Sequence, residues 1–240
     1  HLLAQSSLYG GTFDFITKDL SQYGIDYDLI DGDSPETWKS KLDPNTKAVY
    51  AESITNPLMQ VCDLKAVAKF AADNGIISLV DNTFTSPVNF RPLDLGFDLS
   101  LHSCTKYMNG HNDIAAGVVC GSSEMIERIS HKLGHLGGTL DPHACFLLHR
   151  GMKTLALRIK YQNESAQKIA EFLELRKEIE KVNYPGLTSS KYHKRAAELF
   201  SGFGGMISFV IKGGEPAAEK FIKELTLPVY APSLGGVETL

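Results

Sequence analysis

Short apolar runs alternate with segments of helical periodicity along the first part of the chain, and this alternation limits the possible folds more than any other feature. Four runs are strand-like; they cover residues 47–53, 76–82, 97–103 and 115–122. Between the first two runs, Asp63 is suited to cap a helix, and its apolar stripe ends near Asn74 and Gly75. Buried strands separated by helices predict an α/β fold, with a mostly parallel sheet covered by helices on both faces.

The pattern changes near Gly151, where a mixed-charge stretch of helical character runs toward Lys181 before the turn at 184–187. After it, residues 204–212 alternate like a strand. A further helical stripe is formed by Ala218, Phe221, Ile222 and Leu225. We therefore expect two domains, the first over residues 1–157 and a smaller α+β domain over residues 158–240. The start without Met and the end at "GGVETL" indicate that both are truncated and that the chain is an internal segment.

Composition excludes several classes of function. With 240 residues and 43% hydrophobic content, the chain can bury a substantial core. A net charge of -4 leaves no basic stripe for nucleic acid. No apolar run approaches the ~20 residues that span a bilayer, and no export signal is visible at the start. The four cysteines are widely spaced, which favours reduced thiols and a cytoplasmic location.

Polar residues follow three of the expected strands, at the edge where open parallel sheets bind ligands. Glu52 ends the first, Asp81 follows the second, and Ser103, Thr105 and Lys106 follow the third. A partly buried Asp81 needs a cationic or hydrogen-bonding partner. Both Lys106 and a bound cationic ligand would meet that need.

One ligand, pyridoxal 5′-phosphate (PLP), would use four of these groups. Asp81 would hold a proton on the pyridine nitrogen and Lys106 would react with the aldehyde, while Ser103 and Thr105 would donate hydrogen bonds to the phosphate. Tyr9, before a Gly-Gly turn, could stack on the ring and relay protons. Each residue alone is common on a loop or at a strand end, so only the whole set carries weight.

A metal site is the alternative for the same segment. His102, Cys104, His111 and Asp113 are all possible ligands, and a zinc-dependent hydrolase would use them. Their spacing matches no common zinc pattern. The pair in "HKLGH" at 131–135 lacks the glutamate of a zincin. We therefore expect no metal, and a non-catalytic scaffold is the other alternative to the PLP hypothesis.

The segments "DNTFTSP" (81–87) and "SCTKYMNGHND" (103–113) resemble the signature of the Cys/Met-metabolism PLP-dependent enzymes. Further motifs occur in that family's order: "LYGGT" (8–12), "ESITNP" (52–57), "RGMKTLALR" (150–158), "YPGL" (184–187) and "SLGGVETL" (233–240). The resemblance implies a fold-type I architecture, in which residues 1–157 belong to the PLP-binding catalytic domain. It also implies a homotetramer whose active sites are shared between subunits, acting on small amino-acid substrates.

The resemblance assigns roles to residues motif by motif. Lys106 is the lysine that binds the cofactor, Asp81 the partner of the pyridine nitrogen, and Tyr9 the stacking tyrosine. The remaining assignments are Ser103, Thr105 and Thr83 for the cofactor with Asn56 near its ring hydroxyl, and Ser233 and Glu52 for the substrate. Members also carry phosphate-binding residues upstream and a carboxylate-binding arginine downstream, which are absent from these 240 residues, so the chain alone is expected to bind PLP weakly.

Local differences favour one activity within the family. Methionine γ-lyases carry a cysteine where this chain has Gly11. Lyases of animals and fungi, like the bacterial γ-synthases, carry a glutamate where this chain has Pro232, and the proline is closest to that of plant γ-synthases. The segments "GHND", "LGGTLDP" and "APSLGG" most resemble the γ-synthases. We expect γ-replacement on an activated homoserine ester by cysteine, giving cystathionine in transsulfuration and methionine biosynthesis. Cystathionine γ-lyase and methionine γ-lyase activities remain alternatives, and a plastid location is possible if a transit peptide was removed.

Overall fold

The computed structural model describes all residues from 1 to 240 and divides into two compact units. The first unit comprises residues 1–82, 91–102 and 118–139, and the second comprises residues 83–90, 103–117 and 140–240. The domain boundary between residues 157 and 158 stays a prediction. No helix in the structure is both long enough and apolar enough to cross a membrane.

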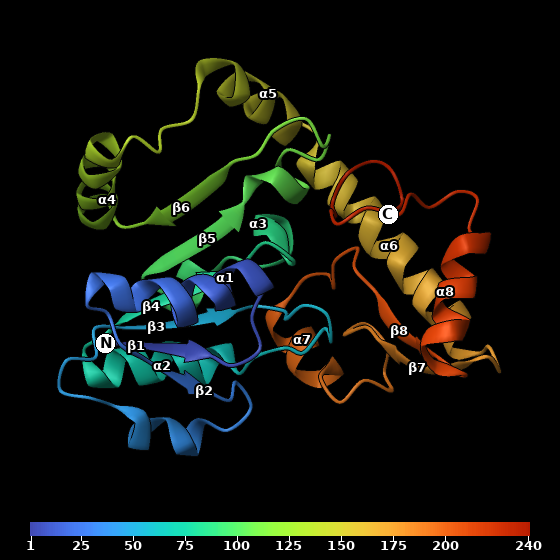
Figure 1. Cartoon of the computed structure of the whole chain (residues 1–240), viewed down its shortest axis with the longest axis horizontal. Helices are drawn as coiled ribbons and strands as arrows, with labels where there is room; N and C mark the ends of the chain where they lie inside the picture. The colour runs from blue at the N-terminus through green and yellow to red at the C-terminus, as the bar shows by residue number, and fades with distance from the viewer. The chain divides into compact units, whose positions relative to one another are not determined.

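A six-stranded sheet dominates the first unit, with the strand order β2-β1-β3-β4-β5-β6 that Figure 1 shows. The strands are β1 (Leu2–Gln5), β2 (Tyr27–Ile30), β3 (Ala48–Glu52), β4 (Ile77–Asp81), β5 (Leu99–Ser103) and β6 (Gly117–Gly121). Strands β1 to β5 are parallel to their neighbours, and β6 points the opposite way to β5 in Figure 1. The predicted α/β class and all four predicted strands are confirmed. Strands β1 and β2 were not predicted.

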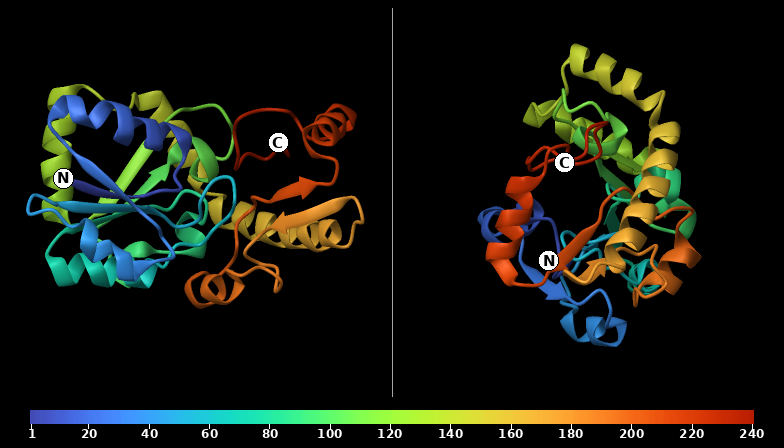
Figure 2. Two further views of the ribbon diagram at one scale, coloured as in Figure 1. Left: turned by 60° about the horizontal axis from the view of Figure 1, so that its bottom comes forward. Right: turned by 90° about the vertical axis from the view of Figure 1, so that its right-hand side faces the viewer.

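Helices lie on both faces of this sheet, as predicted. They are α1 (Gly10–Asp14), η1 (Phe15–Asp19), η2 (Leu20–Tyr23), η3 (Pro35–Lys41), α2 (Leu64–Asn74), η4 (Pro92–Leu95) and α4 (Ser123–Leu136). Figure 2 (left) shows α1 and α2 on opposite faces. Helix α2 begins as expected, because the Asp63 carboxylate accepts a hydrogen bond of 3.0 Å from the Ala66 N–H, and it ends at Gly75 with φ +62°.

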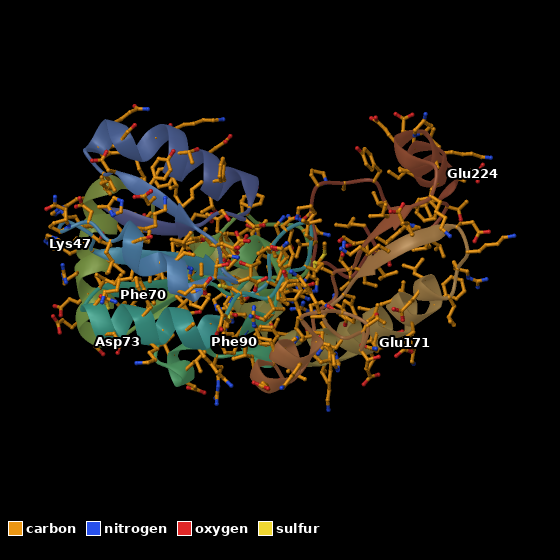
Figure 3. The ribbon with its side chains drawn as sticks, turned by 90° about the horizontal axis from the view of Figure 1, so that it is seen from below. Lys47, Phe70, Asp73, Phe90, Glu171 and Glu224 are labelled. Atoms are coloured by element: carbon orange, nitrogen blue, oxygen red, sulfur yellow. The ribbon has the colours of Figure 1, made fainter.

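Each face of the sheet has its own apolar packing. On one face the buried cluster consists of Ala4, Leu8, Ile16, Leu20 and Tyr50. Elsewhere in the unit, the fully buried Trp38 lies edge-on against Phe70 of α2, which Figure 3 labels, with ring centroids 5.6 Å apart. Two buried faces explain why the strands are apolar runs instead of alternating ones.

The second unit combines helices with a small antiparallel sheet. Its elements are α3 (Ser86–Asn89), η5 (Cys104–Met108), α5 (Pro142–Met152), α6 (Leu155–Glu174), β7 (Ile179–Asn183), α7 (His193–Leu199), β8 (Ser208–Ile211) and α8 (Gly214–Glu224). Strands β7 and β8 pair in antiparallel fashion, and both views of Figure 2 show them between α6 and α8. Its core includes Ala166, Ala170, Tyr184 and Leu187. The strand and helix predicted for residues 204–225 are confirmed.

The predicted end of the long helical stretch near Lys181 is wrong. Helix α5 ends at Met152, α6 ends at Glu174, and the residues up to Asn183 form β7. Glu180 and Lys181 are exposed on this strand, so its sequence has the charged residues that are also typical of the exposed face of a helix. Pairing with β8, a contact 25 or more residues away in the chain, determines the conformation.

Candidate active site

Two carboxyl groups lie side by side at the carboxyl ends of β3 and β4. Glu52 and Asp81 are the last residues of these strands and are direct partners in the parallel register. Only 5% of Glu52 is exposed. Burial raises the pKa of Glu52 to about 8, and repulsion from the Asp81 carboxylate contributes to the increase. This edge of the sheet therefore favours a cationic group beside the two carboxyls.

Glu52 also connects two of the other predicted residues. Its Oε1 accepts a hydrogen bond of 2.7 Å from the Tyr9 N–H, and the backbone N–H of Asn56 donates to the same carboxyl group, which counteracts the rise in its pKa. Tyr9 immediately precedes α1, and its side chain is 58% exposed. A Cβ atom at Gly11 would lie 2.8 Å from Cε1 of Tyr9, so the glycine leaves space for this ring. The first unit thus brings Glu52, Asp81, Tyr9 and Asn56 to one edge.

Tyr50 is a member of this cluster that sequence reasoning missed. It lies in the middle of β3 and is buried, and its hydroxyl is hydrogen-bonded with the Thr12 side chain. Burial raises the pKa of Tyr50, and the charges of Asp81 and Glu52 raise it further. A tyrosine within an apolar strand gives no signal in the sequence that would separate it from ordinary core residues.

In the second unit, Lys106 lies on the short helical turn η5, directly after β5 in the chain. The turn is not regular, because Lys106 has φ -92° and ψ -129°. The Lys106 side chain is half-buried, and its Nζ lies 3.4 Å from Oγ of Ser233 in the second unit. Burial lowers the pKa of Lys106. Residues separated by 127 positions in the sequence are therefore brought together.

The hydroxyl residues near Lys106 hold the local backbone. The Ser103 N–H donates to Oγ1 of Thr83 at 2.8 Å. The Thr105 hydroxyl donates to the Ala116 carbonyl at 3.3 Å and accepts from the Ala116 N–H at 3.0 Å. The structure thus groups Ser103 with Thr83 and gives Thr105 a backbone partner. Their binding to a phosphate stays a prediction.

The polar segment from 102 to 113 satisfies most of its groups locally. Burial lowers the pKa of His102 to about 4, and its Nε2 lies 3.2 Å from Oγ of Ser100. His111 Nδ1 lies 2.7 Å from the Asn109 carbonyl oxygen, and the Asn109 amide donates to Asp113. No group of three or more His, Cys, Asp and Glu side chains is arranged to hold a metal ion.

Three residues that support the Lys106 turn had no predicted role. The Arg158 guanidinium donates to the Tyr107 carbonyl at 2.8 Å. A Cβ atom at Gly151 would collide with the Asn109 carbonyl, and one at Gly235 would lie 2.6 Å from the Tyr107 backbone nitrogen. Two of them belong to the quoted motif "RGMKTLALR" and the third to "SLGG". The motifs contained the signal, but its physical meaning depends on contacts that only the fold reveals.

Comparison with known proteins agrees with this arrangement. The family model described as "Cys/Met metabolism PLP-dependent enzyme" matches residues 1–240. The chain belongs to this family. The membership agrees with the predicted resemblance, and PLP is the cofactor on which the family depends.

Relatives within the family carry different activity names. A cystathionine β-lyase from Lactococcus lactis subsp. cremoris is 43% identical over 241 residues, which cover 100% of this chain and 63% of that protein. A protein from Herpetosiphon aurantiacus, named "Probable cystathionine gamma-synthase", is 39% identical over 95% of this chain and 72% of its own length. Identity of this degree shows the family, but it does not separate the synthase from the lyase.

A solved structure supports the same fold. The crystal structure of metB from Corynebacterium glutamicum superposes with a TM-score of 0.96 at 40% identity, covering 99% of this chain and 62% of that chain. The chain thus spans less than two thirds of the length of the first relatives that it matches. The predicted fold is confirmed. The activity, substrates and partners of the whole protein are proposed below.

Proposed function

We propose that the protein is a PLP-dependent enzyme that replaces the γ-substituent of an activated homoserine ester with cysteine, giving cystathionine. The observation that carries the proposal is the environment of Lys106 in this chain, which belongs to a PLP-dependent family. Its amine is half-buried, has a lowered pKa and lies beside the Ser233 hydroxyl. An amine that reacts with an aldehyde must be neutral, and a lowered pKa increases its neutral fraction near pH 7.

The residues of the chain fit PLP. The cationic pyridine nitrogen suits the paired carboxyls of Glu52 and Asp81, because burial raises the pKa of Glu52 and a cation there would relieve the repulsion from Asp81 that adds to this increase. Lys106 would hold the aldehyde carbon, and Ser103, Thr105 and Thr83 would serve the phosphate. When bound, PLP supplies an electron-withdrawing ring that stabilises negative charge on the carbons of the substrate.

The chain's own residues would handle the protons. Lys106 Nζ is the base that takes the proton from the α-carbon of the substrate, and Asp81 keeps the proton on the pyridine nitrogen. The Tyr9 hydroxyl would assist at the departing γ-group, since its ring is exposed beside Gly11. Ser233 would orient the substrate carboxylate, and Glu52 would also contribute to substrate binding.

Two positions favour replacement over elimination. Gly11 stands where methionine γ-lyases have cysteine, so the chain lacks a side chain that accompanies methionine γ-elimination, and Pro232 resembles the proline of plant γ-synthases at the position where lyases of animals and fungi and the bacterial γ-synthases have glutamate. The second candidate function is cystathionine cleavage, which the 43% identity to a cystathionine β-lyase favours. Both reactions begin with removal of the same α-proton, so one lysine serves either.

Product analysis distinguishes the candidates. The purified protein would be supplied with PLP and incubated in two reactions, one with O-acylated or phosphorylated homoserine plus cysteine, and one with cystathionine alone. Cystathionine formed in the first reaction supports the proposal. Pyruvate or 2-oxobutanoate from the second, with no cystathionine from the first, identifies a β-lyase or a γ-lyase and contradicts the synthase. Lys106→Ala serves as the blank for PLP chemistry in solution.

We also propose that the protein acts as a homotetramer with shared active sites, in the cytoplasm or in a plastid. The family resemblance supports the tetramer. The location rests on four cysteines that are all free thiols in the structure, two of them exposed.

A further inference from the structure

The guanidinium of Arg158 contacts the backbone of η5, the turn that carries Lys106. From α6, its Nη1 donates to the Tyr107 carbonyl at 2.8 Å and its Nη2 donates to the Gly151 carbonyl at 2.9 Å. Longer contacts of 3.4 and 3.5 Å reach the carbonyls of Met108 and Asn109. Nε donates to the Thr154 hydroxyl at 3.0 Å, which fixes the orientation of the guanidinium plane. The guanidinium thus binds backbone carbonyls and a hydroxyl, with no carboxylate among these partners.

The carbonyls of Tyr107, Met108 and Asn109 lie at the end of the short helical turn η5. The last carbonyls of any helix lack intrahelical donors, and η5 ends at Met108, two residues after Lys106. A cationic donor at this end gives these carbonyls a charged hydrogen-bond partner. Hydrogen bonds from a charged donor are stronger than neutral ones. Arg158 therefore acts as a C-terminal cap that comes from another helix.

Two glycines make room for this cap. Gly110 has φ +73°, and a Cβ atom there would collide with the Arg158 guanidinium. At Gly151 a Cβ atom would collide with the Asn109 carbonyl. A side chain at Gly110 would push the guanidinium away from the turn, and a side chain at Gly151 would push α5 away from it. Both glycines therefore allow the close approach that the Arg158 contact needs.

We propose that Arg158 is a positioning residue, which holds the η5 backbone so that the Lys106 amine stays beside Ser233. The inference rests on the proposed role of Lys106. It assigns to the final arginine of "RGMKTLALR" a function that depends on shape and hydrogen bonding. A planar fork with several donors can bind several carbonyls at once, which a lysine ammonium cannot do with the same geometry.

The test compares Arg158→Met and Arg158→Lys with a matched control in the full chain. Arg150→Met is the control, because Arg150 is an exposed arginine of the same motif. Hydrogen exchange of residues 107–110 reports on the turn without any cofactor, since the N–H groups of Asn109 and Gly110 bond within it. Amides of α2 and β7 serve as internal references. The rate at which PLP labels Lys106, trapped with borohydride and mapped on peptides, reports on the amine.

The expected result is a local effect. In Arg158→Met the turn should exchange roughly tenfold or more faster, with unchanged references, and Lys106 should be labelled several-fold more slowly. Arg158→Lys should give an intermediate result and Arg150→Met none. Unchanged exchange in the turn, or an equal increase throughout the second unit, would overturn the proposal. If Arg158→Met does not fold, Arg158→Lys decides by the same criteria, whereas failure to label Lys106 in the wild type would refute the proposed function instead.

Discussion

At the scale of single residues, substitution of Lys106 is the strongest test of the proposed chemistry. Removing its amine removes both the attachment point for PLP and the base for the α-proton, so Lys106→Ala should retain no more than a few per cent of kcat. Steady-state assays with both candidate substrates measure this. Lys153→Ala is the matched control, because Lys153 is exposed in the second unit and should leave kcat unchanged. Substantial turnover by Lys106→Ala would contradict the assignment.

Asp81→Asn tests the partner of the pyridine nitrogen while keeping the size of the side chain. The variant should still bind PLP, because the other cofactor residues remain, but kcat should fall by at least about a hundredfold once the stabilising negative charge is gone. Equilibrium dialysis of PLP and kcat measured on the same preparation separate binding from turnover. Near-normal kcat would show that Asp81 does not hold the proton.

The raised pKa of Glu52 predicts how stability depends on pH. The folded chain holds a proton on Glu52 between its ordinary pKa of 4.5 and its folded value of about 8, and the unfolded chain releases it. Since the folded state binds more protons in this window, the free energy of unfolding should fall as pH rises through it, by up to about 5 kcal/mol. Glu52→Gln retains the acceptor for the Tyr9 N–H but cannot ionise.

Urea unfolding at pH 5, 7 and 9 checks this prediction. The wild type should lose more stability across the series than Glu52→Gln, and the difference between the two should grow with pH. Asp81→Asn should reduce the loss in part, because repulsion from Asp81 contributes to the shift of the Glu52 pKa. Parallel curves for wild type and Glu52→Gln would show that Glu52 is already ionised at pH 5.

At the scale of elements, two helical glycines should respond in opposite directions to the same change. Gly151→Ala in α5 places a methyl group against the Asn109 carbonyl, and overpacking costs roughly 1–3 kcal/mol, more than the helix propensity that alanine adds. Gly134→Ala in α4 meets no atom within 4 Å and should stabilise the protein by about 0.5–1 kcal/mol. Urea midpoints measure both. Equal effects would show that α5 does not approach the turn as described.

Helices and strands could be predicted from the sequence where a local pattern, such as an apolar run or a helix cap, determines the conformation. The apolar runs ending at Glu52 and Asp81 became parallel strands, and the Asp63 cap and Gly75 end bound α2 as expected. Residues 179–183 were misread because a short exposed strand carries charges, and only its distant partner β8 fixes its conformation. Strand β2 was missed for a related reason, since a four-residue strand pairs with a distant neighbour and carries little periodicity of its own.

At the scale of the whole molecule, the site could be predicted only in part from the sequence. Reactive groups at strand ends and ordered motifs led to the prediction of Asp81, Lys106 and Ser233, because chemistry restricts those residue types, and their roles stay predictions. The contacts of Tyr50 with the Thr12 side chain and of Arg158 with the Tyr107 carbonyl join residues that are far apart in the sequence. Local patterns carry no information about such contacts, so motif residues without reactive side chains were recognised but not explained.

Self-association is the remaining property of the whole molecule that the proposal requires. Helices α5 and α6 expose large apolar side chains, with Phe146 at 60%, Leu157 at 72% and Tyr161 at 73%, as expected of surfaces that a second subunit covers. Light scattering coupled to size exclusion should give the mass of four chains, and Leu157→Glu should lower that mass without changing the far-ultraviolet circular dichroism. Glu171→Gln, at a site on α6 that Figure 3 labels, changes an exposed polar residue and is the control. A fully active monomer would contradict active sites shared between subunits, because each site would then have to be complete within one chain.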